Sequence, residues 1–190
     1  MGSADIAVDY RFHAGAPDLP EIPRIGMSMM LRPELGKLTY YGRGPHENYS
    51  DRHTSAYVGV YESTVDEQYY PYISPQENGN KTDVRWMAIT NRQGVGLLAV
   101  GMPFLSAAVR HYTHDDMWNA KHTYEMTRRP EVYVNLDFKQ MGVGGDDSWG
   151  ALAHEPYQLP AKAYSYQFRL RPFATAIDGA PDALAKKPPM

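Results

Sequence analysis

The segment VYVNLDF at residues 132–138 decides the fold class, because its apolar side chains recur at every second position. A period of two places such side chains on one face of an extended strand, whereas a helix requires a period near 3.6. The same alternation occurs in YSYQFRL at residues 164–170 and in IAVDYRF at residues 6–12. Strands that alternate in this way indicate an antiparallel sheet with one face on a core.

Further strand patterns lie between these segments, at residues 24–31, 37–41, 84–90 and 96–100. The last two flank Asn91-Arg92-Gln93-Gly94, which is typical of a hairpin connection. Short strands separated by 16 glycines and 15 prolines predict an all-β, antiparallel β-sandwich. One short helix is expected, capped by Thr113 and ending near Ala120.

The composition argues against several classes of partner. The net charge is −3 and no basic stripe occurs, so neither nucleic acid nor an anionic membrane is an expected partner. The absence of cysteine excludes disulfides and thiol catalysis. The first residues show no signal-peptide pattern, so a cytoplasmic location is expected, and a periplasmic or secreted one stays open.

The chain divides into one domain and a tail. Its 190 residues fit a single domain, which we predict to span residues 1–173. Residues 174–190 are rich in Ala and Pro and are predicted to form a flexible extension outside the core. Three segments without a strand pattern, residues 42–52, 69–79 and 141–149, are predicted to be long loops, where binding residues often lie.

The third of these loops carries the sequence GGDDSW. Gly144 and Gly145 permit backbone angles that other residues avoid, and Asp146 and Asp147 can accept hydrogen bonds from backbone amides and hold the turn. Trp149 then ends a braced loop, where an indole offers a flat face to the C–H face of a pyranose. Burial of Trp149 in the core is an equal alternative from the residues alone.

Two further sets of polar residues allow alternative interpretations. The first loop could bind sugar, but an internal salt-bridged loop or a contact with neighbouring domains is favoured; its polar residues are Arg43, Glu47, Asn48, Asp51 and Arg52. Glu77 and Asn78 precede Gly79 and could clasp a ligand, although a turn with side-chain bonds to the backbone is favoured.

One cluster resembles a metal site in its residue types only. Its spacing fits no standard zinc pattern, so no metal site is predicted. The cluster comprises His111, His114, Asp115, Asp116 and His122.

Three motifs carry a resemblance to a known family, and they occur in the same order as in that family: YGRGPHENYSDR at 41–52, PQENG at 75–79 and QMGVGGDDSW at 140–149. The chain resembles the C-terminal β-domain of the β-galactosidases of glycoside hydrolase family 2, from about residue 5 to Pro172. The resemblance implies an antiparallel β-supersandwich similar to galactose mutarotases. The family's domain has additional strands before the position of Met1, so a domain truncated at its N-terminal side is expected.

The resemblance also implies a role for the third loop. In the family its tryptophan reaches the active site of a (β/α)8 barrel and forms a platform for the aglycone, a role that transfers to Trp149. Asp147 and Ser148 are further candidate substrate contacts, and Gly144, Gly145 and Asp146 shape the loop. Retaining glycosidases use two carboxylates roughly 5–5.5 Å apart. In the family both lie in the barrel, so no catalytic residue is expected in this chain.

The expected partners are therefore the barrel and the other domains of a β-galactosidase, together with a β-galactoside. The family's magnesium and sodium sites are built mainly from the barrel, so no cofactor is expected here. An uncovered sheet edge could also pair with another copy of the chain.

Two alternative functions stay open. A free-standing carbohydrate-binding module would show measurable affinity by itself. A mutarotase-like epimerase would need a carboxylate base and a histidine acid in one cleft. The sequence does not place any such pair together, and the candidates are Glu47 or Glu77 with His46, His111 or His114.

Overall fold

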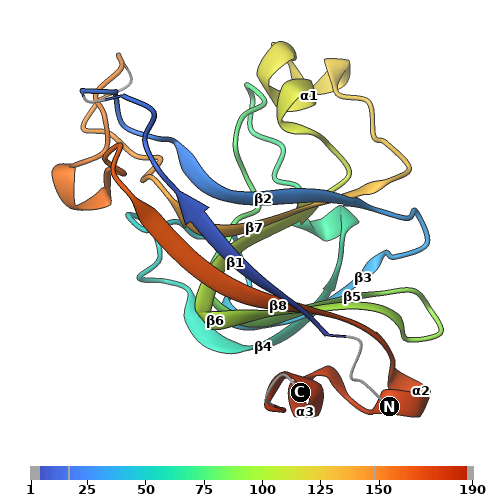
Figure 1. Cartoon of the computed structure of the whole chain (residues 1–190). Helices are drawn as coiled ribbons and strands as arrows, with labels where there is room; N and C mark the ends of the chain where they lie inside the picture. The colour runs from blue at the N-terminus through green and yellow to red at the C-terminus, as the bar shows by residue number, and fades with distance from the viewer. Residues whose placement is uncertain (1–4, 17, 148, 188–190) are drawn as a thin grey trace.

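The computed structural model describes residues 5–16, 18–147 and 149–187 of the chain. Eight strands form one antiparallel sheet in these residues, with the path β1-β8-β6-β5-β3-β4 and with β7 and β2 following from β6 (Figure 1). The strands are β1 Ile6–Phe12, β2 Arg24–Leu31, β3 Lys37–Gly44, β4 Tyr57–Thr64, β5 Lys81–Thr90, β6 Val95–Arg110, β7 Val132–Gln140 and β8 Tyr164–Ala174. The prediction of an all-β, antiparallel fold is confirmed.

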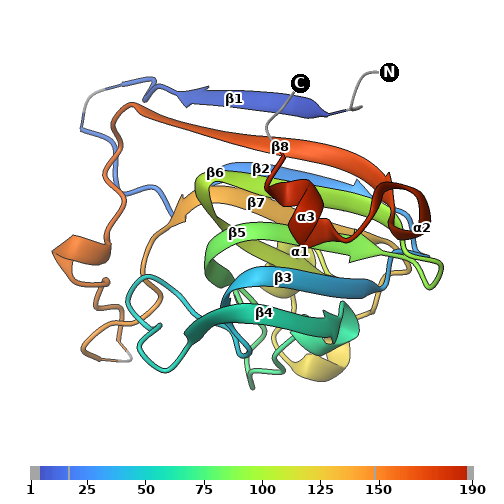
Figure 2. The same ribbon diagram turned by 90° about the horizontal axis from the view of Figure 1, so that it is seen from below.

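The long strand β6 divides this sheet into two leaves, because its halves pair with different neighbours. Residues 95–102 pair with β8, and residues 106–110 pair with β7. The main leaf comprises β1, β8, the first half of β6, β5, β3 and β4, which follow one another from top to bottom in Figure 2. The second leaf comprises β2, β7 and the second half of β6.

The main core lies between the two leaves. Met87 and Phe168 from the main leaf and Val134 and Leu136 from the second leaf belong to one buried cluster. The Tyr166 hydroxyl donates to the Leu136 carbonyl at 2.9 Å and joins the leaves directly. Because these positions alternate along their strands, the period of two that predicts the strands also builds the core.

The hairpin between β5 and β6 forms where it is predicted. The Asn91 side chain accepts hydrogen bonds from the N–H groups of Gln93 at 2.9 Å and Val95 at 3.0 Å. Gly94 has a φ of +76°, a left-handed conformation that suits glycine.

Several strands extend beyond the predicted ranges. The strand β3 continues to Gly44, so the first three residues of the predicted loop 42–52 belong to the sheet. Strand β5 starts three residues early, and β6 continues ten residues past residue 100 to Arg110. The edge strand β4 has no counterpart among the predicted strands.

The helices are short: α1 His114–Asn119, α2 Thr175–Asp178, α3 Pro181–Ala185 and the 3-10 turns η1 Asp66–Gln68, η2 Thr123–Glu125 and η3 Glu155–Tyr157. The predicted helix after Thr113 is confirmed as α1, because the Thr113 hydroxyl accepts from the Asp116 amide and the Asp116 carboxylate accepts from the Thr113 amide. In the described part of the chain, no helix is long and apolar enough to span a membrane.

The C-terminal segment differs from its prediction. Residues 175–178 and 181–185 form the short helices α2 and α3, and α3 packs against the sheet. Leu184 of α3 is fully buried in a second cluster with Trp86, Leu98 and Phe173, on the face of the main leaf away from the main core. The Arg169 guanidinium also donates to the carbonyl of Leu184 at 3.2 Å. Apolar burial and backbone hydrogen bonds thus fix a segment whose composition suggested a free tail.

Candidate functional site

The first motif forms a braced turn after β3. The Asn48 side chain is fully buried and donates to the carbonyls of Arg43 and His46, both at 3.1 Å. Its oxygen accepts from the Thr82 amide at 2.9 Å, which fixes the turn to β5. Arg43 pairs with Asp83 at 2.6 Å. Buried hydrogen bonds and this ion pair therefore brace the first motif within the domain.

Glu47 joins the first motif to the second. One of its oxygens accepts from the Gly79 amide at 2.7 Å, and the other pairs with Arg52 at 2.7 Å and with the Tyr72 hydroxyl. Gly79 has a φ of +74°, and a Cβ there would lie 2.5 Å from the Gln68 carbonyl oxygen. Only glycine therefore fits where the second motif passes the backbone of Gln68.

A cleft of about 440 Å³ opens between the first motif and the segment at residues 67–72. Glu47, Arg52, Tyr70 and Tyr72 line it, and Lys81 forms part of its base. Burial lowers the pKa of Lys81 to about 8, although the nearby Glu47 carboxylate opposes this shift. The polar groups of the cleft are bonded mainly to one another.

Asp51 joins the first motif to the third. Its carboxylate accepts from the Gly144 amide at 2.7 Å. A Cβ on Gly142 would lie 2.7 Å from the same carboxylate, so the small residue admits this contact. The first motif therefore bonds to both other motifs, and the three form one connected structure.

Within the third loop, Asp147 acts as the expected brace. Its carboxylate accepts from the amides of Trp149 at 2.8 Å and Ala151 at 3.2 Å. Asp146 instead pairs with His154 at 2.9 Å, a side-chain contact that was not predicted. A Cβ on Gly145 would lie 2.2 Å from the Ala151 carbonyl oxygen, so this glycine is needed where the loop crosses itself. Ser148 lies outside the described residues.

Trp149 is 90% exposed, which excludes the alternative of a core residue in this chain. Its backbone amide is held by Asp147, and the loop that carries it is tied to Asp51. An indole in such a position has its flat face free for a ligand or for another polypeptide.

Glu77 of the second motif belongs to a partly buried charge cluster. Its carboxylate lies 3.4 Å from Arg24, 3.3 Å from Arg110 and 3.6 Å from His114. Arg24 also lies 3.0 Å from Asp137. The interpretation of Glu77 as a turn residue that bonds to the backbone is therefore wrong, because two guanidinium groups bind its carboxylate.

Asn78, by contrast, is the expected turn residue. Its oxygen accepts from the Tyr70 amide at 3.1 Å, and its nitrogen donates to the Gln76 carbonyl at 2.8 Å.

The structure brings together Glu77 and His114, one of the pairs considered for epimerase chemistry. Burial raises the pKa of Glu77, but Arg110 and Arg24 outweigh it and hold that pKa below its ordinary value. Burial and the same two arginines lower the pKa of His114. These two shifts favour an ionised Glu77 carboxylate beside a neutral His114 imidazole.

The histidines and aspartates of the metal-like cluster are dispersed into separate contacts. His111 bonds to the Glu131 carbonyl at 2.8 Å, His122 pairs with Glu125 at 2.9 Å, and Asp116 pairs with Arg129 at 2.7 Å. In residues 5–16, 18–147 and 149–187, no group of three or more His, Asp or Glu side chains could hold a metal ion.

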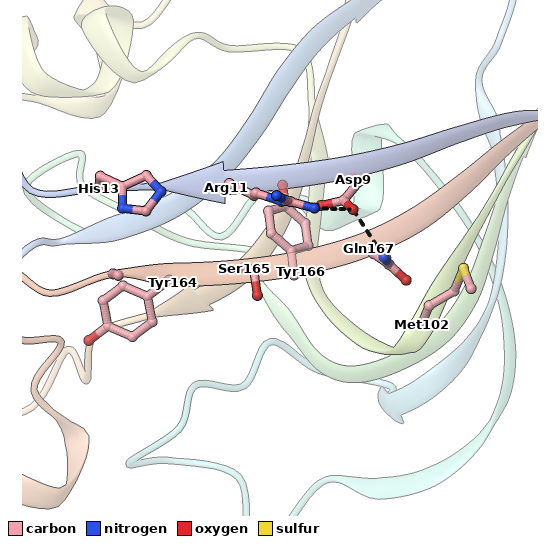
Figure 3. Close-up of a pocket in the computed structure, with 9 residues that line it drawn as sticks. Asp9, Arg11, His13, Met102, Tyr164, Ser165, Tyr166 and Gln167 are labelled. Atoms are coloured by element: carbon pink, nitrogen blue, oxygen red, sulfur yellow. Dashed lines mark hydrogen bonds and ion pairs between the residues drawn. The ribbon is translucent and has the colours of Figure 1, made fainter.

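A groove of about 580 Å³ runs along β1 and β8, and none of the three motifs contributes to it. Asp9 lies between Arg11 and Gln167, at 3.3 Å from each (Figure 3). These bonds from Arg11 and Gln167 lower the pKa of the exposed Asp9 carboxyl. The groove is the polar outer face of a strand pair.

The fold and the braced loops define a class, an antiparallel β-domain that presents an indole on a loop tied to two other loops. Residues 1–170 match the family model described as "Beta galactosidase small chain". The chain therefore belongs to the beta galactosidase small chain family, and the resemblance inferred from the three motifs is confirmed.

Relatives of this chain are named beta-galactosidases. One from Priestia megaterium is 46% identical over 160 residues, which are 84% of this chain and 16% of the relative. One from Vibrio cholerae is 43% identical over 154 residues, 81% of this chain and 14% of the relative. One from Streptococcus thermophilus is 34% identical over 174 residues, 90% of this chain and 17% of the relative. The chain thus spans a small part of each of these relatives.

Proposed function

We propose that this chain is the non-catalytic C-terminal domain of a β-galactosidase, an enzyme that hydrolyses terminal β-D-galactosides such as lactose. In this proposal the loop at residues 141–149 completes the active site, and Trp149 stacks against the aglycone. The catalytic carboxylates, and any magnesium or sodium ions, belong to the (β/α)8 barrel of the complete enzyme. The barrel and the other domains are the partners of this chain.

The exposure of Trp149 carries the proposal. An indole that is 90% exposed adds little to the stability of the domain, because its apolar surface stays in water. An exposed apolar ring of this size is instead typical of a surface that contacts a partner. The loop around it is held by Asp51, Asp147 and Gly145, as binding by a preorganised platform requires. Membership of the beta galactosidase small chain family indicates that the ligand is a β-galactoside.

The proposal extends to the fold in more detail. The two leaves and the core between them suit part of an antiparallel β-supersandwich similar to galactose mutarotases. Strands β1, β2 and β4 each have one edge without a neighbouring strand in the described sheet. Strands of neighbouring domains, or of another copy of the chain, can pair with these edges.

Kinetics of the complete β-galactosidase that carries this domain test the role of Trp149. The Trp149→Ala change should raise KM for lactose roughly tenfold, a loss of about 1.4 kcal/mol, because one stacking face for glucose is removed. Inhibition by free galactose should change little, since galactose occupies the other subsite.

Trp149→Phe is the matched variant, because a smaller ring keeps part of the stacking. It should fall between the wild type and Trp149→Ala in KM for lactose. Unchanged lactose kinetics in Trp149→Ala would refute the platform role.

A further inference from the structure

A second cleft, of about 950 Å³, opens between the segment at residues 74–77 and α1. Its lining includes Arg24, Glu77, His114, Trp118 and Gln140, and none of the residues of the loop 141–149. Figures 1 and 2 both show α1 well separated from the loop that follows β7. The cleft is therefore distinct from the surface around Trp149.

The indole on one wall of this cleft is exposed on a fixed support. Trp118 is 88% exposed, while the adjacent Met117 is buried and anchors α1 to the body of the domain. The capping box of α1 and the pairing of Asp116 with Arg129 at 2.7 Å hold the short helix in place. The ring is thus presented by a braced element, as Trp149 is.

The lining of the same cleft includes polar groups with fixed positions. Arg24 donates to the Gln140 side chain at 3.0 Å and lies 3.4 Å from Glu77, while Arg110 supports Glu77 from behind at 3.3 Å. Glu77 and His114 both reach the cleft surface. The Arg24 guanidinium and the Glu77 carboxylate neutralise each other, and Asp115 and Lys121 add one charge of each sign, so the lining has no excess of either charge.

A flat apolar ring that lines one cleft together with charge-paired donors and acceptors matches the two sides of a sugar ring. We propose that this cleft binds a hexopyranose unit of a carbohydrate, with its C–H face on Trp118 and its hydroxyl groups on Glu77, His114 and Gln140. The site is separate from the aglycone platform and serves to hold a saccharide on the enzyme surface. The choice of a β-galactoside as the ligand rests on the proposed function.

The three tryptophans of the chain provide a direct test, because each indole N–H gives its own proton–nitrogen NMR signal. Trp86 is buried and serves as an internal reference. The signals are assigned in the 190-residue chain with Trp118→Phe and Trp149→Phe, and lactose is then added up to about 100 mM, since a single small site binds with a Kd near 1 mM. The Trp118 signal should shift with saturation, and the Trp86 signal should not.

Two variants complete the test. His114→Ala removes a polar contact at the cleft and should weaken the lactose Kd at Trp118 at least threefold, whereas Trp149→Ala should leave it unchanged. A Trp118 signal that does not move, or that moves without saturation, overturns the inference. A saturable shift confined to Trp149 also overturns it but leaves the proposed function intact, so the two can fail separately.

Discussion

Lys81 shows what one buried charge does to the stability of this domain. It lies 3% exposed, donates to the Gly79 carbonyl at 3.2 Å and faces the ring of Tyr40. Burial lowers its pKa from 10.5 to about 8. The folded chain therefore disfavours the ammonium form, and this cost is fully present below pH 8. Above pH 8 the folded chain releases the proton, while the unfolded chain keeps it up to about pH 10.5, so stability rises across this interval.

The variant Lys81→Met should reveal this cost. Its free energy of unfolding relative to the wild type should fall by up to about 3 kcal/mol between pH 7 and pH 10.5, because only the wild type gains from deprotonation. Urea denaturation at several pH values measures the difference. Lys37→Met removes an exposed ammonium and is the control. Parallel stability curves for Lys81→Met and the wild type would show that Lys81 carries no such cost.

At the residue level, the sequence predicted local contacts and missed distant ones. The bracing by Asp147 spans two to four residues and follows from turn chemistry. The cluster of Arg24, Glu77 and Asp137 joins three strands or loops far apart in the chain, and no local pattern could identify it. Gly26 was the one indication of this cluster in the sequence, because a glycine inside a strand often marks a place where another group approaches the backbone closely. A Cβ there would lie 1.9 Å from the Asp137 carboxylate.

At the level of elements, α3 gives the sharpest prediction. Leu184→Ala should lower the free energy of unfolding by about 2–3 kcal/mol, because a fully buried leucine is lost from the cluster with Trp86 and Phe173. Ile177→Ala in α2 is the matched control, since Ile177 is 85% exposed, and it should change stability by less than about 0.5 kcal/mol. Urea denaturation compares the two variants. Equal effects would mean that the segment is the free tail that its composition suggested.

The predicted strands were those with a clean alternation of apolar and polar residues. The strand β4 escaped prediction because it lies at a sheet edge, where Val58 and Val60 are exposed and Gly59 interrupts the pattern. The second half of β6 follows Pro103, and its small residues Ala107 and Ala108 are both buried. A strand with pairing neighbours on both sides is buried on more than one face, so its sequence loses the period of two.

At the level of the whole molecule, the positions of the carboxylates decide whether this chain can hydrolyse a glycoside without the barrel. Glu77 and Asp137 are two carboxylates that contact the same guanidinium, that of Arg24. Burial raises the pKa of Asp137 to about 7, while arginines lower that of Glu77, and such a separation is typical of an acid and its partner. Asp137, however, is fully buried behind Gly26 and cannot touch a substrate.

The 190-residue chain by itself should therefore not hydrolyse a chromogenic β-galactoside. Glycoside hydrolysis requires two carboxyl groups that both reach the scissile bond, and Asp137, which shares Arg24 with Glu77, is fully buried. Release of the chromophore, measured over hours at high protein concentration, should equal that of the buffer. Glu77→Gln separates a contaminant from true activity, since a contaminant survives this change. Hydrolysis by the purified chain that disappears in Glu77→Gln would place catalysis in this domain. It would contradict the proposal that the catalytic carboxylates belong to the barrel.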